Sequence, residues 1–167
     1  EFKEMLKGAE AEAGLAKLEK KVLAGESTFL SAKDRDAIKQ MDDSTRRKAL
    51  ALLWAYLGRT DLGDATLDAE KYEAAPIALS LGEAFTAISL AFGSLRPIIG
   101  AFQVSQNLIQ AIAPGSSPLL QLPNFTESVV KSVEGEHSKE HWTVQKFMRL
   151  ADQDRRKITV GAGLLSE

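Results

Sequence analysis

The residues with the clearest spacing for chemistry are two histidines and a glutamate in the string HSKEH, His137 to His141, which matches the H-x-x-E-H pattern of inverted zinc peptidases. Two histidines four residues apart can ligate one metal ion where a rigid helix presents them. Here His137, Glu140 and His141 lie in a stretch rich in Glu, Lys and Ser, and the chain has no other histidine. We therefore interpret the string as a solvated loop and predict no metal site.

Other catalytic patterns are missing from the sequence. The chain has no cysteine, which excludes disulfides, thiol catalysis and cysteine-based zinc sites. It also contains no phosphate-binding glycine loop, no G-x-S-x-G elbow and no paired carboxylates in a recognisable cleft. We predict a protein that is not an enzyme, with no catalytic residue and no cofactor.

Two short basic clusters, Arg46–Arg47–Lys48 and Arg155–Arg156–Lys157, are the candidates for binding phosphates. Acidic residues precede each cluster, and the 21 Lys and Arg of the chain are outweighed by 23 Asp and Glu. Nucleic-acid binders usually carry a basic field that neutralises phosphates. We interpret the clusters as solvated helix faces and predict no nucleic-acid partner, with a phosphate or protein contact as the alternative.

The tripeptide NFT, Asn124 to Thr126, has the form of a glycosylation sequon. Asn124 and Glu127 also have the spacing of a capping box, in which two side chains satisfy the first amides of a helix. We favour the structural interpretation, because an oligosaccharide would interfere with packing at a tight helix entry.

The elements that must position these residues are helical throughout. Apolar residues recur at helical spacing in an N-terminal segment, in a run after Ser44, in the apolar stretch from Ile77 to Phe92, in a run after Ser94 and in two shorter helices. Ser44 and Ser94 are predicted N-caps. Pro76 is expected to kink or restart its helix, with a restart favoured near Ser80, and the string ITVGAGLL is expected to be extended.

The apolar stretch from Ile77 to Phe92 is interrupted by polar residues, so we interpret it as a buried core helix and not as a membrane span. The predicted core is Trp54, Phe85, Ile88, Phe92, Ile99 and Phe102. If this is correct, a large-to-Ala change such as Phe92→Ala would cost about 2–5 kcal/mol of stability.

The chain of 167 residues is long enough for one domain with a small appendage. We predict an all-α fold, a helical bundle followed by a small helix-hairpin-helix-like unit. The expected divisions are amphipathic, mobile N-terminal helices over 1–41, the bundle core over 42–115, the helix-hairpin-helix-like unit over 116–160 and an extended exit over 161–167.

The proline-bracketed run from Pro118 to Pro123 gives the second unit its helix-hairpin-helix outline. A hairpin that grips nucleic acid needs glycines, whose amides can approach a phosphate closely. Here Asn124, Phe125 and Thr126 occupy those positions, and we expect Phe125 to turn inward. The element is predicted to be a packing module.

Four strings carry a family resemblance. LGEAFTAISLAFG (Leu81 to Gly93), SQNLIQAIAPGSSPLLQLPNFT (Ser105 to Thr126) and ITVGAGLLSE (Ile158 to Glu167) resemble the Brl domain, and KALALLWAYLGRTDLGD (Lys48 to Asp64) is similar to an earlier helix and turn of the same family. The Brl domain belongs to the J-domain membrane subunit of the post-translational Sec translocon in the endoplasmic reticulum. The resemblance runs from about Ser44 to the end of the chain.

The resemblance implies a non-enzymatic scaffold on the cytosolic face of the endoplasmic reticulum membrane. In that family a helical bundle and a helix-hairpin-helix-like unit carry a sandwich domain that contacts the translocon channel, and they offer a surface to accessory subunits. In that family the full-length protein is membrane-anchored, and its lumenal J domain recruits a chaperone ATPase. The sequence has no HPD tripeptide and no run of strands, so neither the J domain nor the sandwich is expected here. The alternative is an RNA-proximal accessory domain of a spliceosomal helicase, in which the same module occurs.

Overall fold

The computed structural model describes residues 13–24, 30–135, 140–161 and 163. Its described residues form helices and turns without any strand, as predicted for an all-α protein. The chain divides into two compact units, Glu1–Pro114 and Gly115–Glu167. This division lies one residue before the boundary that the sequence suggested.

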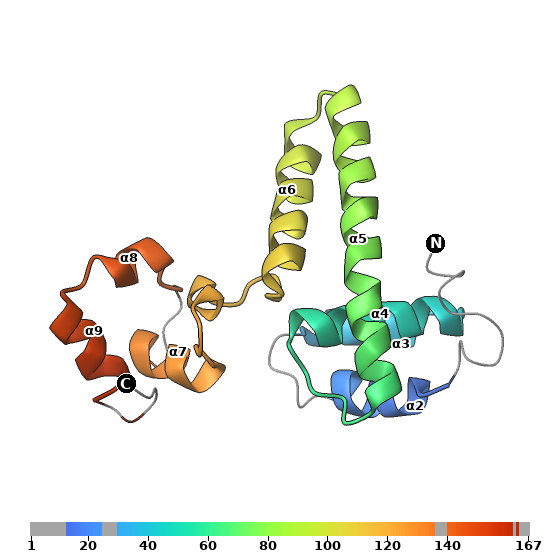
Figure 1. Ribbon diagram of the computed structural model, residues 1–167. Helices are drawn as coiled ribbons and strands as arrows, with labels where there is room; N and C mark the ends of the chain where they lie inside the picture. The colour runs from blue at the N-terminus through green and yellow to red at the C-terminus, as the bar shows by residue number, and fades with distance from the viewer. Residues whose placement is uncertain (1–12, 25–29, 136–139, 162, 164–167) are drawn as a thin grey trace. The chain divides into compact units, whose positions relative to one another are not determined.

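Unit 1 begins with a layer of short helices around α4. The α2 helix (Leu15–Leu18), the π-helical turn η2 (Glu19–Leu23) and α3 (Ala32–Lys39) pack near α4 (Ser44–Leu57) and the first turns of α5 (Ala65–Ala91) (Figure 1). Their shared core holds Leu18, Val22, Leu23, Leu30, Ile38, Ala51, Leu52, Ala55, Leu62, Leu67 and Ala74. We call this part of unit 1 the foot.

The described part of the predicted mobile N-terminal segment is a packed component of the foot. Lys17 Nζ donates to the carbonyl oxygen of Gly63 at 3.0 Å, and Lys21 Nζ donates to the carbonyl oxygen of Asp61 at 2.9 Å. Arg47 forms an ion pair with Glu19 at 3.3 Å. Residues 1–12 and 25–29 of that segment lie outside the described residues.

A buried ion pair joins α4 to α5. The Lys48 side chain is only 1% exposed, and its Nζ donates to Glu70 Oε1 at 3.1 Å and lies 2.9 Å from Oε2. At the next residue, Lys71 Nζ donates to the carbonyl oxygen of Thr60 at 2.8 Å and to Asp68 Oδ1 at 2.7 Å. These contacts fix the direction in which α5 leaves the foot.

The α5 helix is continuous for 27 residues, so the predicted restart near Ser80 is wrong. Pro76 lies inside the helix, which shows that the packing of its flanking turns outweighs the loss of one backbone hydrogen bond. Asp64 caps the helix by accepting from the amides of Thr66 and Leu67. A turn at Gly93 then reverses the chain into α6 (Leu95–Gln110), which runs back along α5 (Figure 1).

The far end of α6 is held by α4. Tyr56 donates its hydroxyl to the carbonyl oxygen of Leu108 at 2.9 Å, and the Arg59 guanidinium donates to the carbonyl oxygens of Gln110 and Ala111 at 3.0 Å each. These last carbonyls of a helix have no partner within the helix, and a cation also suits the helix dipole there. The α5–α6 hairpin is therefore fixed at its base by Tyr56 of α4 and by Arg59, which lies just beyond the end of α4.

Unit 2 has its own small core. It contains the 3-10 turn η3 (Pro118–Gln121), α7 (Glu127–Glu134), α8 (Val144–Met148) and α9 (Asp152–Thr159). Phe125 is buried, as predicted, and its ring meets Phe147 edge to face with centroids 5.4 Å apart. The core is completed by Leu119, Val129, Val130 and Val133. Ile158 and Thr159 are helical, so the predicted extended segment is wrong at its start.

Two predicted caps are shifted. The side chain of Asp43, not that of Ser44, accepts from the Arg46 amide and caps α4. Thr126, not Asn124, is the N-cap of α7, and Glu127 is its first residue. Ser94 does occupy the N-cap of α6, but without a side-chain hydrogen bond to the helix.

We predict that replacing one partner of the Lys48–Glu70 ion pair destabilises the protein, whereas replacing both partners with apolar residues does not. Glu70→Ala should lower the free energy of unfolding by about 3–5 kcal/mol, because it leaves a buried ammonium group without its carboxylate. The double variant Lys48→Met/Glu70→Leu should recover most of this loss. Urea denaturation measures both, and the exposed Lys17→Met change is the control at no more than about 1 kcal/mol. Equal losses in the single and double variants would contradict this.

Candidate functional site

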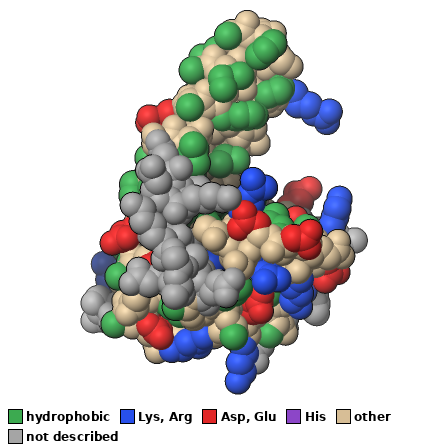
Figure 2. Space-filling view, turned by 90° about the vertical axis from the view of Figure 1, so that its right-hand side faces the viewer, with side chains coloured by type: hydrophobic (Ala, Val, Ile, Leu, Met, Phe, Trp, Pro, Cys, Tyr) green, Lys and Arg blue, Asp and Glu red, His purple; other side chains and the backbone are tan. Residues whose placement is uncertain are grey.

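The α5–α6 hairpin exposes the side chains that were predicted to form the core. Trp54 is partly buried and packs on the foot, but Phe85, Ile88, Ile99 and Phe102 are exposed, and Phe92 is 82% exposed. Figure 2 shows hydrophobic side chains spread over the projecting part of unit 1, with charged side chains gathered below. These side chains follow the helical periodicity that the sequence predicts, but no other helix among the described residues covers them.

The hairpin is poor in charge as well as rich in apolar surface. Between Ala74 and Thr126 the sequence has two ionisable side chains, Glu83 and Arg96, although 26% of the whole chain is charged. The hydroxyls of Thr86 and Ser89 donate to the carbonyl oxygens of Gly82 and Phe85 at 2.8 Å each. Among the described residues α5 is the one helix long and apolar enough to span a membrane, a criterion that core helices of soluble proteins also meet.

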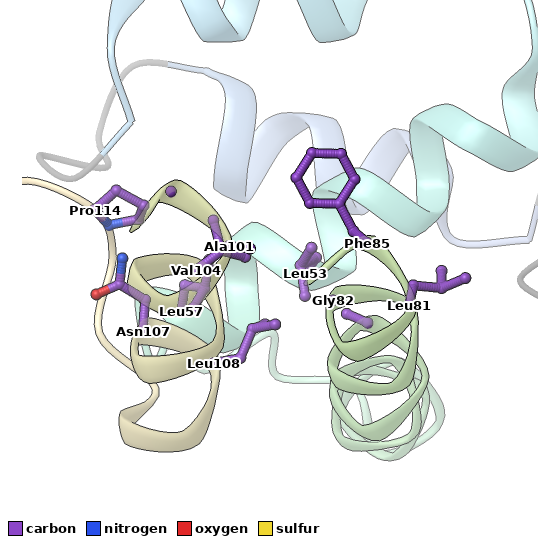
Figure 3. A pocket seen from close by; sticks show the side chains of 12 residues that line it. Leu53, Leu57, Leu81, Gly82, Phe85, Ala101, Val104, Asn107, Leu108 and Pro114 are labelled. Atoms are coloured by element: carbon purple, nitrogen blue, oxygen red, sulfur yellow. The ribbon is translucent and has the colours of Figure 1, made fainter. Parts of the chain in front are cut away.

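A pocket of about 450 Å³ opens at the base of the hairpin. Figure 3 shows α5 and α6 as its two walls, with Leu53 and Leu57 of α4 between them. The remaining lining is Ala78, Leu81, Gly82, Phe85, Gly100, Ala101, Val104, Asn107, Leu108 and Pro114. Sequence patterns missed this pocket, because Gly82 and Gly100 come together only through the hairpin turn.

Most cations of the basic clusters are paired with acids of the same unit. In the first, Arg46 pairs with Asp43 at 3.5 Å, and Arg47 and Lys48 make the ion pairs with Glu19 and Glu70 already described. In the second, Asp152 accepts from both Arg155 and Arg156 at 3.1 Å. Neither cluster offers the free row of cations that a phosphate backbone requires.

In the hairpin turn of unit 2, Asn124 lies where a hairpin that binds nucleic acid needs a glycine. The Phe125 amide donates to the carbonyl oxygen of Leu122 at 3.2 Å, which places Pro123 and Asn124 at the two central positions of a turn. Asn124 has φ +64°, a left-handed conformation that asparagine tolerates better than most residues. This explains why Asn124 is not the helix cap: it makes the turn, and Thr126 caps α7.

The histidine string does not form a metal site among the described residues, where no three His, Asp or Glu side chains are close enough to hold an ion. His137 lies outside them. His141 has both ring nitrogens near acceptors: Nδ1 is 2.8 Å from Glu134 Oε2, and Nε2 is 3.1 Å from the carbonyl oxygen of Gly115. Glu134 is buried and also accepts from the Ser117 hydroxyl at 2.6 Å and the Trp142 amide at 2.8 Å. The cluster ties the start of unit 2 to the end of α7.

No family model matches the chain. It is 36% identical over 83 residues to "DnaJ protein ERDJ2A" and 34% identical over 83 residues to "DnaJ protein ERDJ2B", both of Arabidopsis thaliana; these matches cover 43% and 45% of this chain and 12% of each relative. It is also 32% identical over 111 residues to "U5 small nuclear ribonucleoprotein 200 kDa helicase" of Drosophila melanogaster, which covers 66% of this chain and 5% of the relative.

These similarities support a relationship to J proteins through one part of the chain. The chain spans about an eighth of the length of those relatives, so the similarity concerns one segment of much longer proteins. The helicase similarity covers more of this chain at lower identity.

We predict that Glu134 makes unit 2 sensitive to acid. Burial raises the pKa of Glu134, but the hydrogen bonds from Ser117, His141 and the Trp142 amide outweigh it and hold the pKa below its usual value of 4.5. A lowered folded-state pKa contributes stability that is present above pH 4.5 and is lost as the pH falls through the folded value. Glu134→Gln should flatten the pH dependence of unit 2 stability in this window. Trp142 fluorescence during denaturation measures this in a Trp54→Phe background, in which Trp142 is the only tryptophan.

The control is Asp152→Asn, which removes an exposed carboxylate whose pKa is also lowered, first by Arg155 and then by Arg156. Because that carboxylate is exposed, the change should leave most of the acid dependence in place. A Glu134→Gln curve parallel to that of the unchanged protein would contradict the assignment.

Proposed function

We propose that the chain is the helical part of a Brl domain and acts as a non-enzymatic scaffold in post-translational protein translocation into the endoplasmic reticulum. The observation that carries this proposal is the partial similarity to two DnaJ proteins. The scaffold works on the cytosolic side of the endoplasmic reticulum membrane, as a segment of a larger membrane-anchored protein.

In this role the chain positions other parts and holds no reaction site. The foot and unit 2 each have their own buried apolar side chains and their own internal ion pairs. A following sandwich domain would contact the Sec channel, and accessory translocon subunits would bind the helical surface. The lumenal chaperone ATPase would act only through the J domain of the whole protein.

The alternative is an RNA-proximal accessory domain of a spliceosomal helicase. The longer alignment with the helicase favours it. The paired basic clusters and the asparagine in the hairpin turn of unit 2 speak against direct phosphate binding.

The proposed function predicts which proteins bind the tagged, folded chain. From detergent-solubilised endoplasmic reticulum membranes it should recover translocon subunits, whereas nuclear extract should yield no specific partner above a tag-only control. Mass spectrometry of the captured proteins is the measurement. Recovery of spliceosomal proteins, or binding to a short RNA that weakens steeply with added salt, would support the alternative instead.

A further inference from the structure

The pocket at the base of the hairpin is open because glycine and alanine line it where the two helices approach. A Cβ added to Gly100 would meet no atom within 4 Å, and one added to Gly82 would come no closer than 3.4 Å to Ser105 Oγ. At about 450 Å³ the hollow is in the range of sites that accept ligands or bulky side chains. Asn107 is the one polar side chain in its lining.

An apolar stripe continues from this pocket toward the tip of the hairpin. Leu81 and Phe85 line the pocket, and Ile88 and Phe92 follow them at seven and eleven residues after Leu81. Side chains at this spacing lie on one face of a helix. All four are exposed, so pocket and stripe together form one continuous apolar surface, which we call the docking face.

The docking face has a cation at its rim. Arg96 lies four residues before Gly100 and so on the same side of α6. No described carboxylate forms an ion pair with Arg96. Glu83, the only acid between Ala74 and the end of α6, is on the other side of α5, because Leu81 and Glu83 flank Gly82, which faces Ser105 of α6. The rim is therefore positive.

We propose that the docking face binds an amphipathic helix of a partner protein that places apolar side chains in the pocket and along the stripe and a carboxylate against Arg96. Helices commonly bind in this way, with anchors every three or four residues in an apolar groove. The charge of the rim selects an acidic partner and disfavours a lipid interior, in which Arg96 would have to be buried without a counter-ion. Only the identity of the partner protein rests on the proposed scaffold function.

The test uses two labelled peptide probes and the complete chain. Both are designed 18-residue helices with leucines at the i, i+3, i+4 and i+7 spacing, flanked in one by glutamates and in the other by lysines. Fluorescence anisotropy should show that the acidic peptide binds about tenfold tighter at low salt, because one close charge pair has this magnitude. Arg96→Glu should reverse the preference.

Three variants locate the binding surface. Gly100→Leu should occupy the pocket and abolish peptide binding, because a Cβ at this position meets no atom within 4 Å, while circular dichroism stays unchanged. Phe85→Ser should weaken binding, but Phe102→Ser should not. These two phenylalanines are 52% and 58% exposed, and they lie on opposite sides of the hairpin because Gly100 and Phe102 flank the buried Ala101.

The proposal is overturned by failure of both peptides to bind, by equal affinity for both, or by equal losses in Phe85→Ser and Phe102→Ser. Binding to neutral phosphatidylcholine vesicles in place of the peptides would also overturn it, in favour of a lipid surface. A failed pull-down of translocon subunits with intact, charge-selective peptide binding would remove the proposed function and leave the docking face.

Discussion

The architecture of unit 1 depends on the length of α5, which extends well beyond the helices packed around its first turns. A helix of 27 residues is about 40 Å long, and its first four turns, as far as Leu79, pack against the foot. The Lys48–Glu70 pair and the Asp64 cap fix those turns. The rest of α5 is supported by α6 alone, so a large apolar surface projects away from the foot, while the pocket lies where the hairpin meets α4. The buried core and the exposed apolar surface of unit 1 therefore lie toward different ends of the same helix.

The projecting hairpin shows what helical periodicity can and cannot predict. The spacing of Phe85, Ile88 and Phe92 places them on one face of a helix, and they do lie there. Periodicity does not say what covers a face, and a run apolar on nearly all sides was interpreted as a core. Phe92→Ala is now expected to change the free energy of unfolding by less than about 0.5 kcal/mol, as surface changes usually do. Leu52→Ala, in the foot, is expected to lower the free energy of unfolding by about 2–5 kcal/mol instead.

Unit 2 was easier to anticipate, because its signals are local. The proline-bracketed run, the inward Phe125 and the helix after it are present as expected. The error concerns which residue performs which task. Asparagine suits both a helix cap and a left-handed turn, and the turn uses Asn124 because Pro123 before it fixes the geometry. The pocket could not be predicted in this way, since Gly82 and Gly100 are on different helices.

Pro76 gives the hairpin a mechanical property. Proline has no amide hydrogen, so the carbonyl of Tyr72, four residues earlier, lacks its usual partner in the helix. Bending α5 about this position costs less than bending it elsewhere, because one hydrogen bond is already missing. Ala91 lies about 22 Å beyond Pro76 along the helix, so a tilt of about 10° moves it by about 4 Å. The foot would stay in place while the apolar tip of the hairpin shifts sideways. The hairpin could then contact partner surfaces that lie at slightly different positions.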